Sequence, residues 1–420
     1  MRDTSRMTEQ TLIIDALGSK GDGIAELDDA RVHVPFALPG EHVRVTGPAD
    51  SLKLTAIEVS SDDRQDAACR HFGICGGCTL QHLKPAPYQD FKRQLVANAL
   101  TSRGLEQVEI APCLHEPAGG RRRATFAAAR RGKAIVLGFH KRKSHDLVDL
   151  TECPVSTSRI TNVLPALRQL ADMILKAPKD ELSFLLTDAS NGLDLHIPKL
   201  PRKFSERDAM QVTAFALELG FIRISLKGFD TLTREQPWLA AGTARLLPPP
   251  GGFLQATTPG ETHMAALVLD HIKGAGKVAD LFSGAGTFAL RIAEHASVHA
   301  VEGDGPAIAA LEMSARASQG TIHPVTTEHR DLFRRPLLTG ELNRYDAIVL
   351  DPPRAGATAQ VEQLAASSVA RIAYVSCNPG TLSRDLAVLS AGGYSVRRVT
   401  PVDQFVWSAH VEAVAELTRD

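Results

Sequence analysis

From residue 253 onward, short apolar segments alternate with segments of helical periodicity, and this alternation constrains the fold more than any other feature of the chain. The apolar segments are KVADLF, VHAVE, YDAIVLD and RIAYVSC, and the helical ones include FALRIAEHA, PAIAALEMSARA and TLSRDLAVLSAG. Apolar strands separated by helices are typical of parallel sheets covered on both faces. The sequence therefore predicts an α/β fold with a Rossmann-like, doubly wound sheet over residues 251–420.

Polar side chains that could take part in catalysis or ligand binding occur at, or just past, the ends of successive predicted strands. They are Asp280, Glu302, Asp331, Asp351 and Cys377. The carboxyl ends of parallel strands meet at one edge of a sheet, and ligands of doubly wound sheets bind beyond that edge. We therefore expect these side chains to line one cleft.

A glycine-rich turn, Gly284-Ala285-Gly286, follows the first of these strands and opens a helix, as in nucleotide-cofactor sites. Asp280 beside this turn would repel the pyrophosphate that a helix N-terminus attracts. The sulfonium and ammonium groups of S-adenosylmethionine would tolerate the carboxylate. Glu302 could accept hydrogen bonds from ribose hydroxyls of either cofactor. These features favour S-adenosylmethionine over NAD, and a turn that merely packs on its strand is the remaining interpretation.

The turn Ser376-Cys377-Asn378-Pro379 follows a further strand and should present Cys377 to the same cleft. A free cysteine is usually a small core residue, but a place at a strand end beside a cofactor site favours a nucleophile. Carbon 5 of uracil is a poor nucleophile, and thiolate addition at carbon 6 produces an enolate whose carbon 5 can attack a sulfonium methyl. Because a thiol with a pKa of about 8.5 is mostly protonated at neutral pH, a neighbouring positive group would help.

Such a reaction also needs a base that removes the proton from carbon 5. Glu412 in the terminal segment SAHVEAVAEL is the first candidate and His410 the second, although an isolated carboxylate near a chain end is usually a surface residue. Asp351 precedes two prolines that fix a rigid loop, where it could bond a base or a cofactor or simply end its strand. An aromatic residue after the prolines would indicate methylation of an amine, and Arg354 stands there instead.

The first part of the chain has a different pattern. Residues 9–60 hold five or so short alternating strands separated by turns, which predicts a small OB-like β-barrel at 1–62. Residues 63–250 give mixed signals and are expected to form an α+β central domain, ending at the proline-rich run before residue 251. Within it, residues 100–143 carry ten Lys and Arg against three Glu, a balance suited to RNA phosphates. Arg121, Arg122 and Arg123 are the expected contacts, although an arginine run is often only a solvated face.

Three cysteines lie close together in a loop with the spacing Cys69-x5-Cys75-x2-Cys78. With a distant fourth thiol they fit either zinc or an iron-sulfur cluster, and a redox pair of Cys75 and Cys78 is less favoured because of the third cysteine. Spacing alone makes Cys113 and Cys153 nearly equal as the fourth ligand. Six cysteines in 420 residues are too few for a disulfide scaffold.

Four segments occur in the order found in RNA uracil-5-methyltransferases: DLFSGAGTFAL, DPPRAG, SCNPGTLSRD and a terminal HVE. Over nearly its whole length the chain resembles, in particular, the bacterial 23S rRNA enzymes with a TRAM domain and an iron-sulfur cluster. The resemblance implies that Cys377 is the nucleophile, that Glu412 is the base and that the barrel is a TRAM domain. It also implies cofactor contacts from Gln255, Phe282, Thr287, Glu302, Asp331 and Asp351, and ligation of a 4Fe-4S cluster by Cys69, Cys75, Cys78 and Cys153.

Two positions depart from the family pattern, because relatives often have Asn where this chain has Thr257 and Thr287. The contact at Thr287 is therefore lost or made by a hydroxyl. We expect a monomeric cytoplasmic RNA methyltransferase without a secretory signal or membrane span, acting on rRNA rather than tRNA. The rival readings are an NAD-dependent oxidoreductase, an amine methyltransferase and a non-catalytic iron-sulfur protein that binds RNA.

Overall fold

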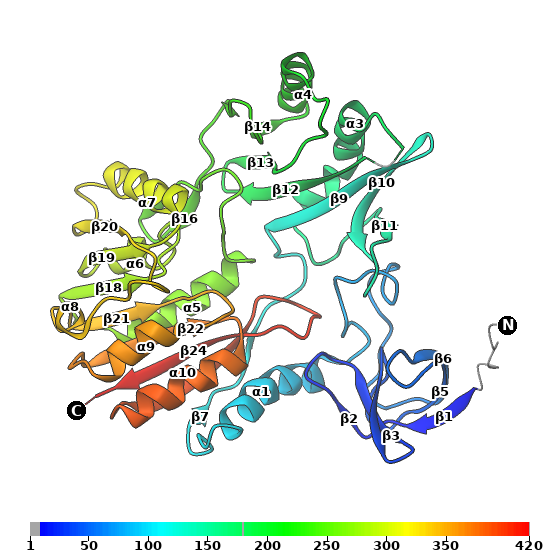
Figure 1. The fold of residues 1–420 in the computed structure, drawn as a ribbon, viewed down its shortest axis with the longest axis horizontal. Coiled ribbons are helices and arrows are strands. Elements are labelled where there is room, and N and C mark those ends of the chain that lie inside the picture. Colours follow the sequence, from blue (N-terminus) through cyan, green and yellow to red (C-terminus); the bar gives the residue numbers. More distant parts are fainter. Residues whose placement is uncertain (1–8, 179, 420) are drawn as a thin grey trace.

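The computed structural model describes residues 9–178 and 180–419, and it arranges them as an N-terminal barrel-like unit, a central sheet and a large carboxyl-terminal sheet (Figure 1). In the part of the chain so described, no helix combines the length and apolar character needed to cross a bilayer.

The N-terminal unit consists of two antiparallel three-stranded sheets, ordered β1-β5-β6 and β2-β3-β4. Its strands are β1 (Gln10–Ile13), β2 (Ala16–Leu17), β3 (Gly23–Leu27), β4 (Ala30–Val34), β5 (His42–Thr46) and β6 (Lys53–Val59). Alternate residues of both sheets, such as Leu12, Val32 and Val43, pack into one apolar core. The expected short strands are thus present, and they enclose a core of their own.

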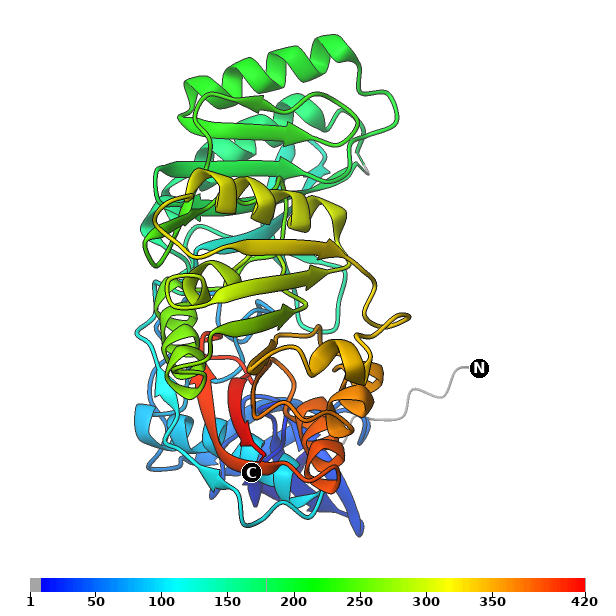
Figure 2. The same cartoon turned by 90° about the vertical axis from the view of Figure 1, so that its left-hand side faces the viewer.

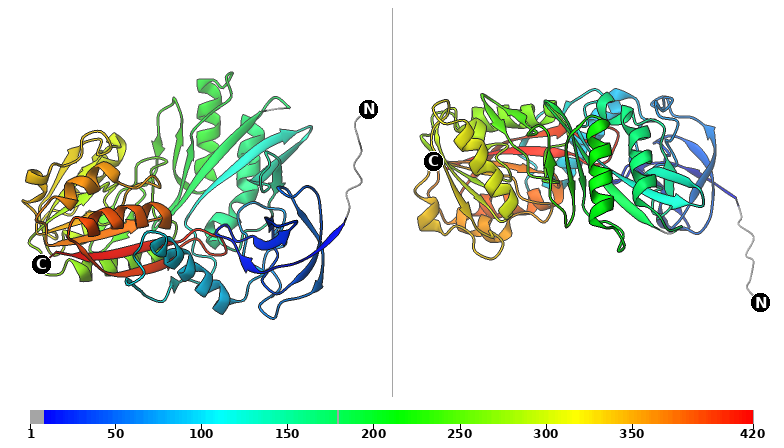
Figure 3. Two further views of the ribbon diagram at one scale, coloured as in Figure 1. Left: turned by 60° about the horizontal axis from the view of Figure 1, so that its bottom comes forward. Right: turned by 90° about the horizontal axis from the view of Figure 1, so that it is seen from above.

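The central sheet has seven strands in the order β11-β10-β9-β12-β13-β14-β15. They are β9 (Arg123–Arg131), β10 (Ala134–His140), β11 (Leu147–Asp149), β12 (Glu181–Ala189), β13 (Gly192–Ile197), β14 (Phe221–Leu226) and β15 (Leu232–Thr233). The helices α2 (Ser158–Asn162), α3 (Leu164–Ile174) and α4 (Glu206–Glu218) accompany it, and α3 and α4 lie side by side in Figure 3. Leu167 and Leu170 of α3 pack on Phe126 and Phe184 of the sheet, so the expected α+β character is confirmed.

The carboxyl-terminal sheet has nine strands, with the order β20-β19-β18-β21-β22-β24-β23-β7 and β8 paired to β23. The main strands are β18 (Lys277–Leu281), β19 (Ser297–Glu302), β20 (Val325–His329), β21 (Ala347–Leu350), β22 (Arg371–Ser376), β23 (Ser395–Asp403) and β24 (Glu412–Thr418). The first five are parallel, and β24 runs antiparallel to both of its neighbours. The predicted α/β doubly wound sheet is therefore present.

Helices cover both faces of this sheet, as Figure 2 shows for α5 on one side and α9 and α10 on the other. One face carries α5 (Thr258–His271), α6 (Ala289–Ile292) and α7 (Gly305–Ala317), and the other carries α1 (Pro85–Thr101), α8 (Thr339–Leu342), α9 (Thr358–Ala365) and α10 (Pro379–Ala391). The helix expected over 288–296 is short, since it begins at Ala289, directly after the glycine turn, and already ends at Ile292.

Two segments expected in the central domain belong instead with the carboxyl-terminal sheet. The strands β7 (Glu109–Ile110) and β8 (Leu114–His115) pair with β23, and α1 packs beside them (Figure 3). The hairpin of β16 (Leu239–Ala241) and β17 (Ala244–Leu246) shares the core of α5 and α7. The boundaries 63–250 and 251–420 are wrong for these segments, because sheet pairing between residues distant in sequence leaves no local pattern.

Candidate active site

The carboxyl ends of the parallel strands place the expected polar residues along one edge of the sheet. Glu302 ends β19, Asp351 follows β21 and Cys377 follows β22. Glu412 opens β24, whose antiparallel register sets Ala413 opposite Ser376 and so brings Glu412 beside Cys377. Strand pairing, and not sequence proximity, brings together the candidate nucleophile and the candidate base.

Cys377 is half-buried and lines a cavity of about 710 Å3. The wall includes Arg354 and Asn378 near the thiol, Gly77 of the cysteine loop, and Lys20 of the N-terminal unit. A volume of this size is ordinary for a site that takes a nucleotide-sized ligand. The cavity therefore runs from the proposed nucleophile to the cysteine loop and to the N-terminal unit.

Burial raises the pKa of the Cys377 thiol to about 11. The carboxylates of Glu412 and Asp351 add to this rise, and the guanidinium of Arg354 opposes it. Arg354 is thus the neighbouring positive group that the sequence required, but its effect is smaller than the cost of burial. The thiol of the free protein is protonated at neutral pH.

Glu412 is buried, at 4% exposure, and its pKa is raised to about 7. Desolvation causes the rise, and a hydrogen bond from Gln404 Nε2 to Glu412 Oε1 (3.0 Å) and the charge of Arg354 oppose it. A carboxylate whose pKa lies near neutrality can both accept and return a proton under ordinary conditions. His410 is more exposed, and burial together with nearby cations lowers its pKa.

A chain of amide side chains connects Glu412 to Asp351. Gln404 Nε2 also donates to Gln255 Oε1 (2.7 Å), and Gln255 Nε2 donates to Asp351 Oδ2 (3.0 Å). Gln255 is 2% exposed, so its amide is held firmly between these partners. Sequence reasoning did not identify Gln404, because it follows β23 without a recognisable motif and reaches Glu412 only through the fold.

Asp280 lies within β18 and is fully buried. Neither of its carboxylate oxygens accepts a hydrogen bond of ordinary geometry from the described residues. Burial raises its pKa to about 8, against a weaker opposite effect of the Ala289 backbone. An unpaired buried carboxyl group is costly, and a cationic ligand would offset that cost.

Asp280 belongs to a group of acidic side chains. Burial raises the pKa of Asp351 well above its usual range, and the neighbouring carboxylates of Glu412, Asp280 and Glu302 add to the rise. Glu302 fixes the glycine turn by accepting hydrogen bonds from the N–H groups of Gly284 and Asp304, both at 2.8 Å. This concentration of carboxyl groups suits a cation such as a sulfonium compound, which would favour their ionised forms, and disfavours a pyrophosphate.

Phe282 has a positive φ of 61°, a strained conformation for a residue with a bulky side chain, and such strain is concentrated at functional sites. Its ring lies 5.4 Å, centroid to centroid, from that of Phe333. Asp331 is half-exposed nearby and accepts a hydrogen bond from the Phe333 N–H (3.0 Å). Phe282, Phe333 and Asp331 thus lie together beside the glycine turn.

The two threonines that depart from the family pattern have local roles. Thr257 caps α5, since its hydroxyl accepts from the Gly260 N–H (3.2 Å) and donates to Glu116 (2.8 Å). Thr287 is buried, and its carbonyl accepts from Arg291 (2.6 Å). Both therefore support the backbone around the site.

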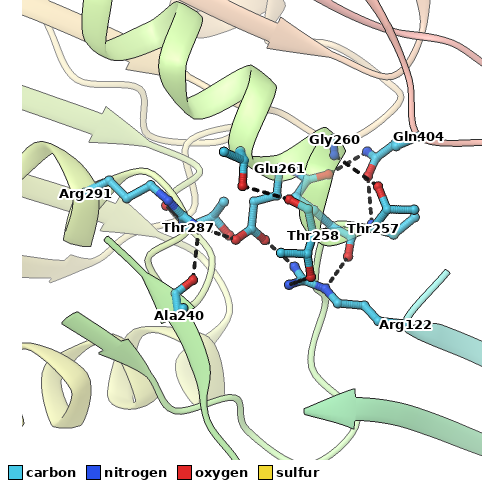
Figure 4. Close-up of polar contacts among 12 residues, drawn as sticks. Arg122, Ala240, Thr257, Thr258, Gly260, Glu261, Thr287, Arg291 and Gln404 are labelled. Atoms are coloured by element: carbon cyan, nitrogen blue, oxygen red, sulfur yellow. Dashed lines mark hydrogen bonds and ion pairs between the residues drawn. The ribbon is translucent and has the colours of Figure 1, made fainter. Parts of the chain in front are cut away.

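Arg122 was expected to contact phosphate, and this expectation is wrong because the side chain is buried at 4% exposure. Figure 4 shows its guanidinium against Glu261, with Arg291 approaching the same carboxylate from the other side. Arg291 also holds the carbonyl of Thr287. Arg122 therefore ties the central sheet to the glycine turn through a buried ion network.

The neighbours of Arg122 are half-buried. Arg121 lines the cysteine cavity, with its guanidinium 6.0 Å from the Phe405 ring, and Arg123 donates to the Gly251 carbonyl (3.2 Å). Desolvation lowers the pKa of both guanidinium groups. The arginine run is thus largely buried between domains and is not a fully exposed surface patch.

Four cysteines line one cavity of about 370 Å3, and these are Cys69, Cys75, Cys78 and Cys153. Cys113 lies elsewhere, near Lys92 and Asp403, with its pKa raised by burial to about 12. Burial raises the pKa of Cys69, Cys75 and Cys78, to about 12 for Cys78, and the neighbouring thiols add to this rise. Across residues 9–178 and 180–419, no group of three or more His, Cys, Asp or Glu side chains is arranged to hold a metal ion.

Comparison with known proteins identifies the family of this chain. Residues 249–420 match the model of the tRNA (Uracil-5-)-methyltransferase family. An uncharacterized RNA methyltransferase of Brucella melitensis is 47% identical over 99% of both chains. The 23S rRNA (uracil(1939)-C(5))-methyltransferase of Halomonas elongata is 32% identical over 96% of this chain and 88% of its own.

Among solved structures, the tRNA (uracil-54, C5)-methyltransferase of Pyrococcus abyssi, in complex with S-adenosyl-L-homocysteine, has the same fold. The TM-score is 0.73 with 23% identity, covering 97% of this chain and 99% of that one. The strand-end site, the ordered motifs and these full-length relatives lead to one conclusion: the chain belongs to the S-adenosylmethionine-dependent RNA uracil-5-methyltransferase family.

Proposed function

We propose that this protein methylates carbon 5 of a uridine in 23S rRNA, with Cys377 as covalent nucleophile and Glu412 as base. The observation that carries the proposal is the pairing of β22 with β24, which sets a thiol and a buried carboxylate of raised pKa side by side in one cavity. A protein that only bound RNA would have no need of this pair. The reading as a non-catalytic iron-sulfur protein is therefore disfavoured.

The residues present can perform each step in turn. Cys377 gives up its thiol proton to solvent, its Sγ adds to carbon 6, and the ring electrons move toward carbon 5 and the carbonyl at carbon 4. Bound S-adenosylmethionine supplies the electrophilic methyl that carbon 5 takes up. Glu412 then accepts the proton of carbon 5, and the electrons of that C–H bond expel Cys377 and restore the double bond. The expelled thiolate takes up a proton, Glu412 passes its proton to solvent, and both side chains return to their starting state.

Seven residues are proposed to hold S-adenosylmethionine: Gln255, Asp280, Phe282, Thr287, Glu302, Asp331 and Asp351. The unpaired oxygens of Asp280 and the surrounding carboxylates fit a ligand with a sulfonium and an ammonium group. Glu302 stands at the end of the second strand, where ribose hydroxyls are commonly bound. Thr287 is proposed to contribute through its position in the turn.

The RNA is proposed to enter the cavity that runs from Cys377 to Lys20. A uracil within folded RNA must be extruded from its stack, and contacts to flanking nucleotides offset the cost of a few kcal/mol. Arg354 and Lys20 line the cavity and can meet phosphates. We assign the N-terminal barrel as a TRAM domain with this RNA-binding role, within the divisions 1–62, 63–250 and 251–420 as adjusted above.

The choice of rRNA rests on the Halomonas elongata relative, whose name specifies 23S rRNA and which aligns over nearly all of this chain. The Pyrococcus abyssi enzyme is named for tRNA, but at 23% identity it supports the fold alone. Methylation of tRNA is the second candidate substrate. We further propose that the enzyme works as a monomer in the cytoplasm.

The four cavity cysteines are proposed to hold a 4Fe-4S cluster. Four thiols facing one interior space are the donor set that such clusters use. A single zinc ion would need thiols about 2.3 Å from one centre. Zinc is the alternative occupant of the same four thiols. These cysteines would anchor the loop that carries Gly76 and Gly77 into the RNA cavity.

One experiment tests the covalent mechanism. RNA containing 5-fluorouridine should trap a methylated protein–RNA adduct that survives denaturation, because fluorine at carbon 5 cannot leave as a proton does. Cys377→Ala should abolish the adduct, and Cys113→Ala should form it normally, since Cys113 does not line the cavity. An adduct that persists in Cys377→Ala would exclude this nucleophile. Parallel reactions with 23S rRNA and tRNA transcripts distinguish the two substrates.

A further inference from the structure

Gln404 is the buried centre of the polar network at the active site. It is 2% exposed and follows the last residue of β23. Its Nε2 donates to Glu412 Oε1 (3.0 Å) and Gln255 Oε1 (2.7 Å), while its Oε1 accepts from the Ala256 N–H (2.7 Å). Both hydrogen bonds that the Gln404 NH2 group donates therefore go to the proposed base, Glu412, and the proposed cofactor residue, Gln255.

The orientation of this amide is determined by the backbone. The Ala256 N–H can only donate, so the side-chain atom that faces it must be the oxygen of Gln404. The NH2 group then has to face Glu412 and Gln255. A flipped amide would leave the Ala256 N–H opposite a second donor inside the protein, which is costly.

Fixed donors have a consequence for Glu412. An ionised carboxylate accepts hydrogen bonds at both oxygens, whereas a protonated carboxyl group has an O–H that needs an acceptor. Two hydrogens of Gln404 point at acceptors, and one of them meets Glu412. The same amide fixes the Oε1 of Gln255, so that the Gln255 NH2 turns to Asp351.

We propose that Gln404 is a positioning residue that holds Glu412 ionised and aimed at the proton on carbon 5, while it links the base to Asp351 through Gln255. The inference rests on the proposed function, in which Glu412 is the base. It adds a specific dependence: release of the methylated uridine from Cys377 requires Gln404, and formation of the adduct does not.

The charged groups around Glu412 determine the expected pH behaviour. Arg354 favours its ionised form, while Asp351 and Cys377 are acidic neighbours whose own ionisation Glu412 disfavours. Asp280 and Glu302 lie one step further, next to Asp351. Removing the Gln404 donor leaves Arg354 as the remaining opposing influence on the raised pKa of Glu412, so the base should need a higher pH to ionise.

The test compares two variants with wild-type protein. Gln404→Met keeps the size but removes the donors, and Gln404→Glu replaces the donor with a second acid. The matched control is Gln360→Met, which removes a fully buried amide in α9 that bonds only the backbone of Leu337. Each protein is assayed for adduct formation on 5-fluorouridine RNA, and for turnover and adduct release on ordinary uridine RNA across pH.

At saturating S-adenosylmethionine, which offsets any loss of cofactor affinity through Gln255, both Gln404 variants should form the 5-fluorouridine adduct at the wild-type rate, since that adduct needs no removal of a proton from carbon 5. On ordinary RNA they should release product at least about tenfold more slowly, with methylated adduct accumulating and the acid limb of release moved to higher pH. Gln360→Met should behave as wild type in both assays.

Unchanged release and an unchanged acid limb in Gln404→Met would overturn the assignment. So would equal losses of adduct formation and release, or loss of the fold in both variants, because either result would mean that the residue only stabilises the domain. Failure of the proposed function gives a different result, namely no 5-fluorouridine adduct with wild-type protein.

Discussion

Glu412 lies beside Cys377 because β24 runs antiparallel to β22 and starts where β22 ends. Ala413 is opposite Ser376. Cys377, which follows Ser376, and Glu412, which precedes Ala413, therefore lie next to each other in the site. The antiparallel strands β23 and β24 thus supply the proposed base to a cleft otherwise built from parallel strands. The pKa of about 7 for this buried carboxyl group gives the first prediction.

Release of the methylated product should depend on pH through Glu412. The base acts only when ionised, and its pKa is raised to about 7, so release should fall about tenfold per pH unit below pH 7 and level off above it. Single-turnover release of labelled RNA measures this limb. Glu412→Gln should remove the limb and slow release by roughly 100-fold to 10,000-fold while the 5-fluorouridine adduct still forms. Retention of the same pH limb in that variant would assign it to another group.

Binding of S-adenosylmethionine should release protons at neutral pH. Asp280 has a pKa of about 8 in the free protein, above its ordinary value, and a cationic ligand favours its ionised form. Affinity should therefore rise with pH up to about 8 and then become constant. Calorimetry at pH 7 in buffers of different ionisation enthalpy measures the protons released. Asp280→Asn should weaken binding and reduce the proton release, and an unaltered release would refute the role of Asp280.

The buried pair of Arg122 and Glu261 should be important for stability. Glu261→Leu leaves the guanidinium groups of Arg122 and Arg291 buried without their partner, so it should cost about 3–5 kcal/mol of unfolding free energy, whereas Arg122→Leu leaves Glu261 paired with Arg291 and should cost less. The matched control is the exposed pair of Arg131 and Glu181, where Arg131→Leu should cost at most about 1 kcal/mol. Urea titration measures both. Equal effects of the buried and exposed substitutions would contradict the structural account of Arg122.

Cysteine substitutions should separate the cavity thiols from the remote one. Cys153→Ser should lose bound iron and visible absorbance after anaerobic purification, because Cys153 lines the cavity with Cys69, Cys75 and Cys78. Cys113→Ser should keep both, since its thiol lies beside Lys92 and Asp403. Metal analysis and absorbance spectra provide the comparison. A colourless wild-type protein that contains zinc would replace the cluster with a zinc site.

The amino-acid sequence by itself determined the local features of this protein. Apolar strands alternating with helices specified the doubly wound sheet, and the glycine turn and Cys377 fell at strand ends where such sheets place their chemistry. These inferences succeeded because helix period, strand period and turn chemistry are properties of neighbouring residues. The ordered motifs indicated a resemblance to RNA uracil-5-methyltransferases and, through it, methylation of carbon 5 of uracil.

Only the tertiary structure decided which distant residues meet. It placed Gln404 between Glu412 and Gln255, buried Arg122 against Glu261, and joined β7 and β8 to β23. Each of these depends on pairing across sheets and between domains, where register and burial are set by the packing of the whole chain. A single linear sequence carries no local signal for such contacts, because their free energy comes from groups brought together only when the protein folds.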